Sequence, residues 1–153
     1  MKYAVIASLA ILVFFGLQPR GIIFETAWIE GRAFILYLAA AIFAGGFLTP
    51  ALLPFLPFRS FAVKGWLAGA AAVTPLVIIT PAGGELFLYR AAALTLFPLL
   101  SSYLALQFTG ASTYTGPSGV RRELKLSLPL YIAGAAAALI LLALYKIKTW
   151  GLI

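Results

Sequence analysis

The chain alternates between long apolar stretches and short segments that hold most of its charged residues. The apolar stretches are continuous and lack the alternation of apolar and polar residues that is typical of membrane β-strands. A helix that crosses a bilayer needs about 20 such residues. The pattern therefore predicts one all-α membrane domain over residues 1–153, a bundle of about five transmembrane helices at approximately 3–17, 33–56, 65–80, 85–106 and 126–145.

Several predicted spans contain proline, which removes a backbone hydrogen bond from a helix and kinks it. The second span holds Gly45-Gly46 and then Pro50, so we expect it to be bent or broken near Thr49-Pro50. Pro75 and Pro98 predict kinks in the third and fourth spans.

The third span begins with two glycines four residues apart, Gly65 and Gly69. This G-x-x-x-G spacing lets two helix backbones approach closely. Because the chain is rich in glycine and alanine, we interpret the spacing as a sign of packing within one chain rather than of dimerisation.

Composition supports an integral membrane protein and limits its chemistry. Hydrophobic residues make up 63% of the chain and charged residues 10%, against about 25% charged in soluble domains. The sequence contains no Cys, His, Asp or Asn, which excludes disulfides, thiolate nucleophiles and the usual ligands of zinc, haem and iron–sulfur clusters. Only four carboxylates occur, at Glu25, Glu30, Glu85 and Glu123. We expect no catalytic residues, no metal site and no cofactor bound by this chain alone.

The net charge of +7 fits attraction to anionic lipid head groups rather than to nucleic acid, because the cations are scattered between the spans. Five spans place the termini on opposite sides. Six cations then share the side of the N-terminus: Lys2, Arg59, Lys64, Arg121, Arg122 and Lys125. Five lie on the other side: Arg20, Arg32, Arg90, Lys146 and Lys148. The positive-inside rule favours a multi-pass protein of the cytoplasmic membrane with its N-terminus in the cytoplasm and its C-terminus outside.

The fourth span carries polar residues that suggest an intramembrane polar site. Glu85 lies in its first turn, where the helix dipole favours a negative charge. Arg90 either snorkels to the head groups or faces the bundle interior. Together with the neighbouring hydroxyl groups, the candidate site comprises Arg90, Tyr89, Glu85, Ser101 and Ser102.

Between the fourth and fifth spans, residues 107–125 form the predicted loop with the most unusual composition. It holds five Ser or Thr residues, one Tyr and three glycines, and a basic cluster follows. Such a loop can bind an anion or a partner through backbone N–H groups and hydroxyls, although it is not a P-loop. Alternatively, it is a connector in which Thr115 or Ser118 caps a helix that begins near Val120. The candidate binding residues are Thr109, Gly110, Ser112, Thr113, Tyr114, Thr115, Ser118, Gly119, Arg121 and Arg122.

This loop also carries a family resemblance. The run Gln-Phe-Thr-Gly-Ala-Ser-Thr-Tyr-Thr-Gly-Pro-Ser-Gly-Val-Arg-Arg-Glu (107–123), followed by one last apolar helix, resembles the signature in the C-terminal membrane domain of the mercury-methylating corrinoid proteins. Residues 59–66 resemble the turn between the second and third helices of that domain. Two positions, Gln107 and Gly116, differ from the residues expected there.

The resemblance implies a membrane platform against which a corrinoid-binding domain docks. In that family the membrane domain follows a soluble domain whose Cys-containing cap helix ligates cobalt, whereas this chain has no Cys. It therefore implies a free-standing membrane partner, with any corrinoid carried by another protein and ferredoxin-like proteins as further partners. At most the chain is the membrane subunit of a corrinoid-dependent methyltransferase system.

Three functional hypotheses follow. The first is a non-catalytic anchor that docks a soluble corrinoid or methyltransferase-type partner through the loop 107–125, either alone or as a homo-oligomer. The second is a small transporter or channel lined by span two, Pro75, Pro98, Ser101-Ser102 and Arg90. The third is a quinone- or lipid-binding membrane subunit with an interfacial pocket around Trp66, Tyr89 and Arg90.

Overall fold

The computed structural model describes residues 2–18, 21–22, 24–52, 60–80, 86–110 and 117–151. Six α-helices lie within them: α1 (Lys2–Gly16), α2 (Phe24–Phe43), α3 (Thr49–Ala51), α4 (Phe61–Ile79), α5 (Leu86–Gly110) and α6 (Pro117–Thr149). A π-helical segment, η1 (Ala44–Leu48), joins α2 to α3. Two short antiparallel strands, β1 (Leu17–Gln18) and β2 (Gly21–Ile22), connect α1 to α2. Apart from these strands the fold is helical, as predicted.

Four segments are long and apolar enough to cross a membrane: Glu30–Ala51, Phe61–Ile79, Phe87–Phe108 and Arg121–Thr149. The first predicted span is shorter. Helix α1 has 15 residues and is therefore about 22 Å long, whereas the hydrocarbon core of a bilayer is about 30 Å thick. The chain thus has the character of a membrane protein, and four of the five predicted helices reach spanning length.

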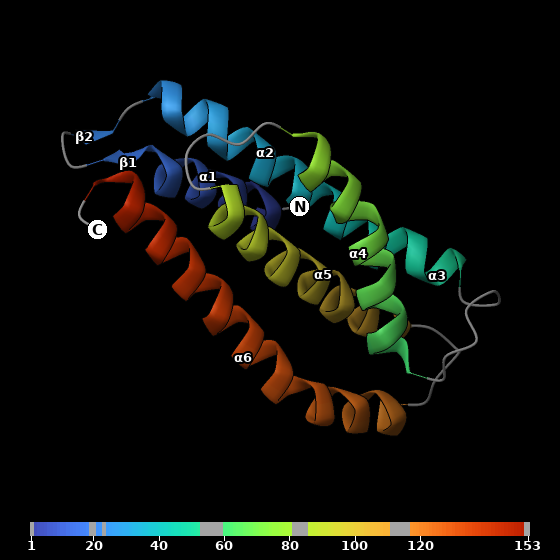
Figure 1. Ribbon diagram of the computed structural model, residues 1–153. Coiled ribbons are helices and arrows are strands. Elements are labelled where there is room, and N and C mark those ends of the chain that lie inside the picture. Colours follow the sequence, from blue (N-terminus) through green and yellow to red (C-terminus); the bar gives the residue numbers. More distant parts are fainter. Residues whose placement is uncertain are drawn as a thin grey trace.

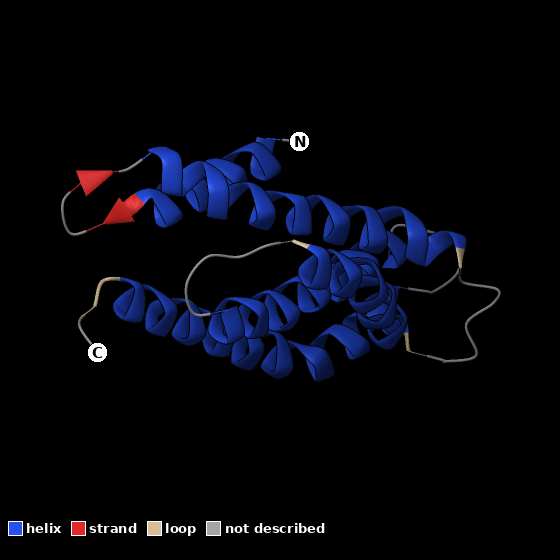
Figure 2. Ribbon diagram, turned by 45° about the horizontal axis from the view of Figure 1, so that its top comes forward, coloured by secondary structure: helices blue, strands red, loops and turns tan. Residues whose placement is uncertain are grey.

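Helices α1 and α2 form a hairpin on one side of α4, α5 and α6 (Figure 2). The ends of α3 and α5 and the starts of α4 and α6 lie at one end of the bundle (Figure 1). We call this the basic end, because Arg121, Arg122 and Lys125 lie in the first turns of α6. The strand pair, the start of α5 and the end of α6 lie at the opposite end, which we call the strand end (Figure 1).

Helix α5 is the centre of the bundle and packs against α2, η1, α3, α4 and α6. Glycines allow the closest of these contacts. A Cβ atom at Gly65 would lie 2.5 Å from the Cβ of Ala105, and one at Gly69 would lie 2.5 Å from the Cβ of Ser101. Gly45 in η1 is similar, since a Cβ there would lie 3.0 Å from the Cα of Ser101. The G-x-x-x-G spacing therefore serves packing within the chain, as predicted.

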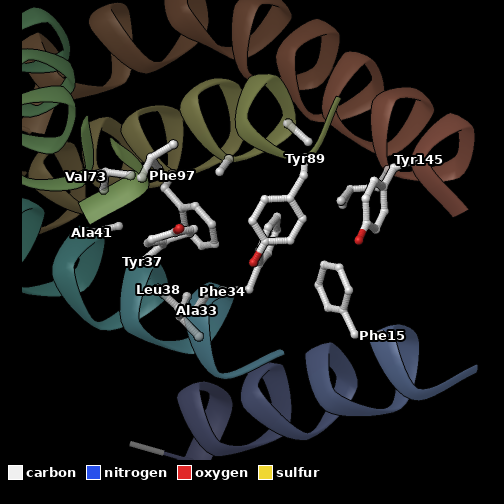
Figure 3. Packing of buried hydrophobic residues seen from close by; sticks show 14 residues of the cluster. Phe15, Ala33, Phe34, Tyr37, Leu38, Ala41, Val73, Tyr89, Phe97 and Tyr145 are labelled. Carbon is white, nitrogen blue, oxygen red and sulfur yellow. The ribbon is translucent and has the colours of Figure 1, made fainter. Parts of the chain in front are cut away.

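An aromatic cluster fills the core between α1, α2, α5 and α6 (Figure 3). The ring of Phe34 lies at its centre, with its centroid 4.8 Å from that of Phe15, 4.9 Å from Tyr89 and 5.2 Å from Phe97. Tyr145 extends the cluster to α6, 5.5 Å from Tyr89. Such ring pairs contribute about 0.5–1.5 kcal/mol each beyond the area they bury. They hold the short helix α1 against the longer helices.

The predicted break near Thr49-Pro50 corresponds to a change of hydrogen-bonding pattern. Residues on both sides of η1 keep right-handed helical dihedrals, so the helix continues through it. Both the backbone N–H and the hydroxyl of Thr49 donate to the carbonyl of Ala44, the hydroxyl at 2.8 Å. Pro50 has no N–H to donate, and the π-helical segment lies directly before it.

The packing of α4 on α5 predicts an unusual effect of alanine. Replacing Gly by Ala normally stabilises a helix, but we expect Gly65→Ala to lower the free energy of unfolding by about 1–3 kcal/mol, because the added methyl meets the Cβ of Ala105 and the backbone of Ser102. Reversible unfolding in mixed detergent micelles measures this. Gly134→Ala is the control, because its methyl meets the methyl end of Leu99, which can rotate away. Equal stability of the two variants would contradict the packing argument.

Candidate functional site

The helices extend far into the segment predicted as a loop. Helix α5 continues through Thr109 and Gly110, and α6 begins at Pro117 and includes Ser118 and Gly119. A proline at the first helical position costs no hydrogen bond, because the N–H there has no partner within the helix. The connection is therefore 111–116, and α6 begins earlier than the predicted start near Val120. The candidate residues Ser112, Thr113, Tyr114 and Thr115 lie outside the described residues, as does Glu85.

Glu123, in the second turn of α6, binds the start of α4. Its Oε1 atom accepts hydrogen bonds from the hydroxyl of Ser60 and from the backbone N–H of Ala62, the latter at 3.0 Å. Ser60 is the N-cap of α4, and its side chain accepts from the N–H of Val63. The carboxylate thus lies at the positive end of the helix dipole, where a negative charge is favourable. This contact fixes the start of α6 against α4.

The neighbours of Glu123 remain available to solvent or to a partner. The side chains of Arg121, Arg122 and Lys125 are exposed. Because the Glu123 carboxylate is bound to α4, the exposed charges of this turn are all positive. Two of the ten residues predicted for the binding loop, Arg121 and Arg122, therefore lie together on a helix that is held in place.

The predicted intramembrane polar site is divided between two places in the bundle. Ser101 and Ser102 tie α5 to α4: their hydroxyls donate to the backbone carbonyls of Gly65 and Ala62 at 2.9 and 2.7 Å. Ser102 also bonds the hydroxyl of Tyr131 at 2.8 Å, which adds α6 to this contact. Both serines are buried, and their hydrogen bonds join helices rather than line an open path.

Tyr89 and Arg90 lie near the strand end instead. The hydroxyl of Tyr89 donates to the backbone carbonyl of Glu30 at 2.9 Å. Arg90 reaches the carbonyl of Ile78 in the last turn of α4 at 3.5 Å, where a cation is favoured by the helix dipole. Trp66 lies in the first turns of the antiparallel helix α4, so it does not share a pocket with Tyr89 and Arg90.

A buried pair of charged residues at the strand end was not predicted. Lys146 is only 5% exposed, and its Nζ atom donates to the carbonyls of Phe15 and Leu17 at 2.8 and 3.0 Å. The first carbonyl belongs to the last turn of α1, where carbonyls lack helical partners, and the second belongs to the start of β1. The rings of Phe14 and Phe15 also lie 5.7 Å from this ammonium group.

Glu30 lies beside this lysine. Its side chain is also buried, with 8% exposed, and it lies in the electrostatic neighbourhood of Lys146 and Tyr145. Within the described part of the chain, neither its Oε2 atom nor the hydroxyl of the neighbouring Tyr145 has a hydrogen-bond partner. From the sequence, Glu30 was named only among the four carboxylates and Lys146 only among the cations on the side of the C-terminus. The scarcity of carboxylates was the one signal that singled out Glu30.

Neither the basic end nor the strand end offers a set of metal ligands among the described residues. Among the described residues, no group of three or more His, Cys, Asp or Glu side chains lies close enough together to hold a metal ion. The chemistry that these sites can perform is therefore hydrogen bonding and charge pairing by Glu, Lys, Arg, Tyr and Ser.

Comparison with known proteins gives no relative: no protein-family model, no curated protein and no solved structure matches the chain.

The buried charges predict a large effect of removing the lysine. We expect Lys146→Met to lower the free energy of unfolding by about 3–5 kcal/mol, because the buried carbonyls of Phe15 and Leu17 lose their charged donor and Glu30 loses a nearby cation. Unfolding in mixed detergent micelles measures this, with Arg32→Met as the control at an exposed cation. The double variant Glu30→Gln/Lys146→Met should lose less than the sum of the single losses. Additive losses would show that the two charges are not coupled.

Proposed function

We propose that this protein is a membrane-embedded anchor, a platform subunit that docks a soluble corrinoid or methyltransferase-type partner at its basic end. The observation that carries the proposal is the exposed group Arg121, Arg122 and Lys125 at the start of α6. The one carboxylate among them, Glu123, is bound to α4 and does not neutralise the surface. Such a surface favours a partner with an acidic face.

The platform is also held firmly. Glu123 joins α6 to the start of α4, and about two turns further along Tyr131 joins α6 to Ser102 of α5. A surface fixed in this way loses little conformational entropy when a partner binds.

The sequence resemblance supports the chemical identity of the partner. The signature over 107–123 resembles that of the membrane domain of the mercury-methylating corrinoid proteins. Since this chain has no Cys, the cobalt ligand and the methyl-transfer chemistry would belong to the partner. A ferredoxin-like protein would be the matching electron donor. We place the basic end in the cytoplasm, where such soluble proteins are found, on the basis of the positive-inside rule.

We expect charge reversal at the basic end to abolish docking. The protein would be reconstituted in nanodiscs and titrated with the purified, cobalamin-loaded corrinoid domain of a mercury-methylating protein. Arg121→Glu with Arg122→Glu should weaken binding roughly tenfold or more, because two attractive charges become repulsive.

Arg32→Glu with Lys148→Glu is the matched control, because it changes the same charge in the first half of α2 and the last turn of α6, away from the start of α6. Binding that is unaffected by Arg121→Glu with Arg122→Glu, or equally weakened in both variants, contradicts docking at the basic end.

A small transporter or channel is the second candidate, and one observation favours it. Glu30 and Lys146 are buried at the ends of two segments of membrane-spanning character, and buried charges in such segments often mark the path of an ion or substrate. Proton flux into proteoliposomes, read with an enclosed pH dye, tests this reading. Flux that Glu30→Gln abolishes would support it, and wild-type protein without proton flux would remove it.

A further inference from the structure

Lys146 holds the end of α1 through a contact for which a second acceptor competes. Its ammonium group donates to the backbone carbonyls of Phe15 and Leu17 and lies over the rings of Phe14 and Phe15, and all of these partners are neutral. The carboxyl group of Glu30 lies in the same electrostatic neighbourhood, and its Oε2 atom has no hydrogen-bond partner. The buried lysine therefore binds dipoles, while a carboxyl oxygen near it lacks a donor.

An ionised carboxylate attracts an ammonium group more strongly than a backbone carbonyl does. The attraction between opposite charges grows as the surroundings become less polar, and a buried carboxylate oxygen without a donor costs free energy. A protonated carboxyl group carries no charge and lacks this attraction. The four-carbon stem of a lysine is flexible, so its ammonium group can change acceptors without moving the helix backbone.

The end of α1 depends on side chains for its attachment to α5 and α6. The backbone of α1 packs closely against α2, whereas the longer helices α5 and α6 reach it mainly through side chains. These include Lys146 and the rings of Tyr89 and Tyr145, whose centroids lie 5.8 and 6.3 Å from that of Phe15. Loss of the two lysine hydrogen bonds would therefore loosen the last turn of α1 and the strand that follows it.

Among the described residues, the charged and titratable groups around Glu30 come from two helices. Lys146 and Tyr145 belong to α6, and Tyr89, whose hydroxyl donates to the backbone carbonyl of Glu30, belongs to α5. The end of α1 contributes carbonyls and aromatic rings, α4 has no basic residue in its last turn, and Arg32 of α2 is exposed. Lys146 is therefore the buried cation that responds to a change of charge on Glu30.

We infer that Lys146 and Glu30 form a pH-sensitive latch for α1. When Glu30 is protonated, the ammonium group stays on the carbonyls of Phe15 and Leu17, which is the arrangement in the structure. When Glu30 is ionised, its carboxylate competes for the ammonium group, and the end of α1 is released from α6. The proton moves only between solvent and the carboxyl group, so the latch stands whether or not protons cross the membrane or a partner docks at the basic end.

Hydrogen–deuterium exchange of the protein in nanodiscs tests the latch. Glu30→Gln removes the competing charge, so we expect amide exchange in the last turns of α1 to slow several-fold. Lys146→Met removes the donor and should speed the same exchange several-fold. In the wild-type protein, exchange in α1 relative to that in α5, a ratio that corrects for the intrinsic effect of pH, should fall on acidification. Glu30→Gln should abolish this pH dependence.

Two exposed cations supply the controls. Arg32→Gln removes a charge from the same helix as Glu30, and Lys125→Met removes a lysine from the same helix as Lys146, so neither should change exchange in α1. Glu30→Met supplies a second uncharged side chain if Glu30→Gln does not fold. Faster exchange in the Glu30 variants would show that the carboxylate only holds the lysine in place, and unchanged exchange would show that the two acceptors do not compete. Either result would overturn the latch.

Discussion

The bundle depends on the close approach of three glycines to one turn of α5. Gly65 and Gly69 from α4 and Gly45 from η1 leave room for the backbone and side chain of Ser101. The serine hydroxyls can then reach carbonyls of α4 directly. In a bilayer the hydrophobic effect does not drive helices together, so close van der Waals contact and such hydrogen bonds supply the attraction. A bulkier side chain at these positions would separate the helices and break both kinds of contact.

Contacts of the same turn of α5 also position α6 and the cations exposed on it. Ser102 binds Tyr131, which fixes α6 beside α5, and Glu123 then reaches the start of α4. The exposed cations of α6 are placed by these contacts. The proposed partner surface is therefore built on this frame.

The sequence predicted the features that depend on local pattern. Continuous apolar stretches predicted the helices, and the spacing of Gly65 and Gly69 predicted packing within the chain. The twelve residues from Tyr89 to Ser101 separate the two by about 18 Å on one helix, but the sequence could not show which backbone groups their hydroxyls reach, because that depends on how the helices align. It counted Lys146 only among the cations of one side, since nothing in the local sequence indicates that the end of α1 comes to lie beside it. The functional proposal rests on a sequence resemblance and on exposed charge, and neither is fixed by the fold alone.

The contact between Lys146 and α1 sets an order of events during synthesis. The ribosome makes Phe15 131 residues before the lysine that caps its carbonyl. Until α6 is inserted, the end of α1 lacks this cap, and Phe15 packs only on rings of earlier helices such as Phe34 and Tyr89. The last contact of α1 therefore forms only when the last helix arrives. A nascent chain interrupted before Lys146 would keep this aromatic packing but leave the carbonyls of Phe15 and Leu17 without their donor.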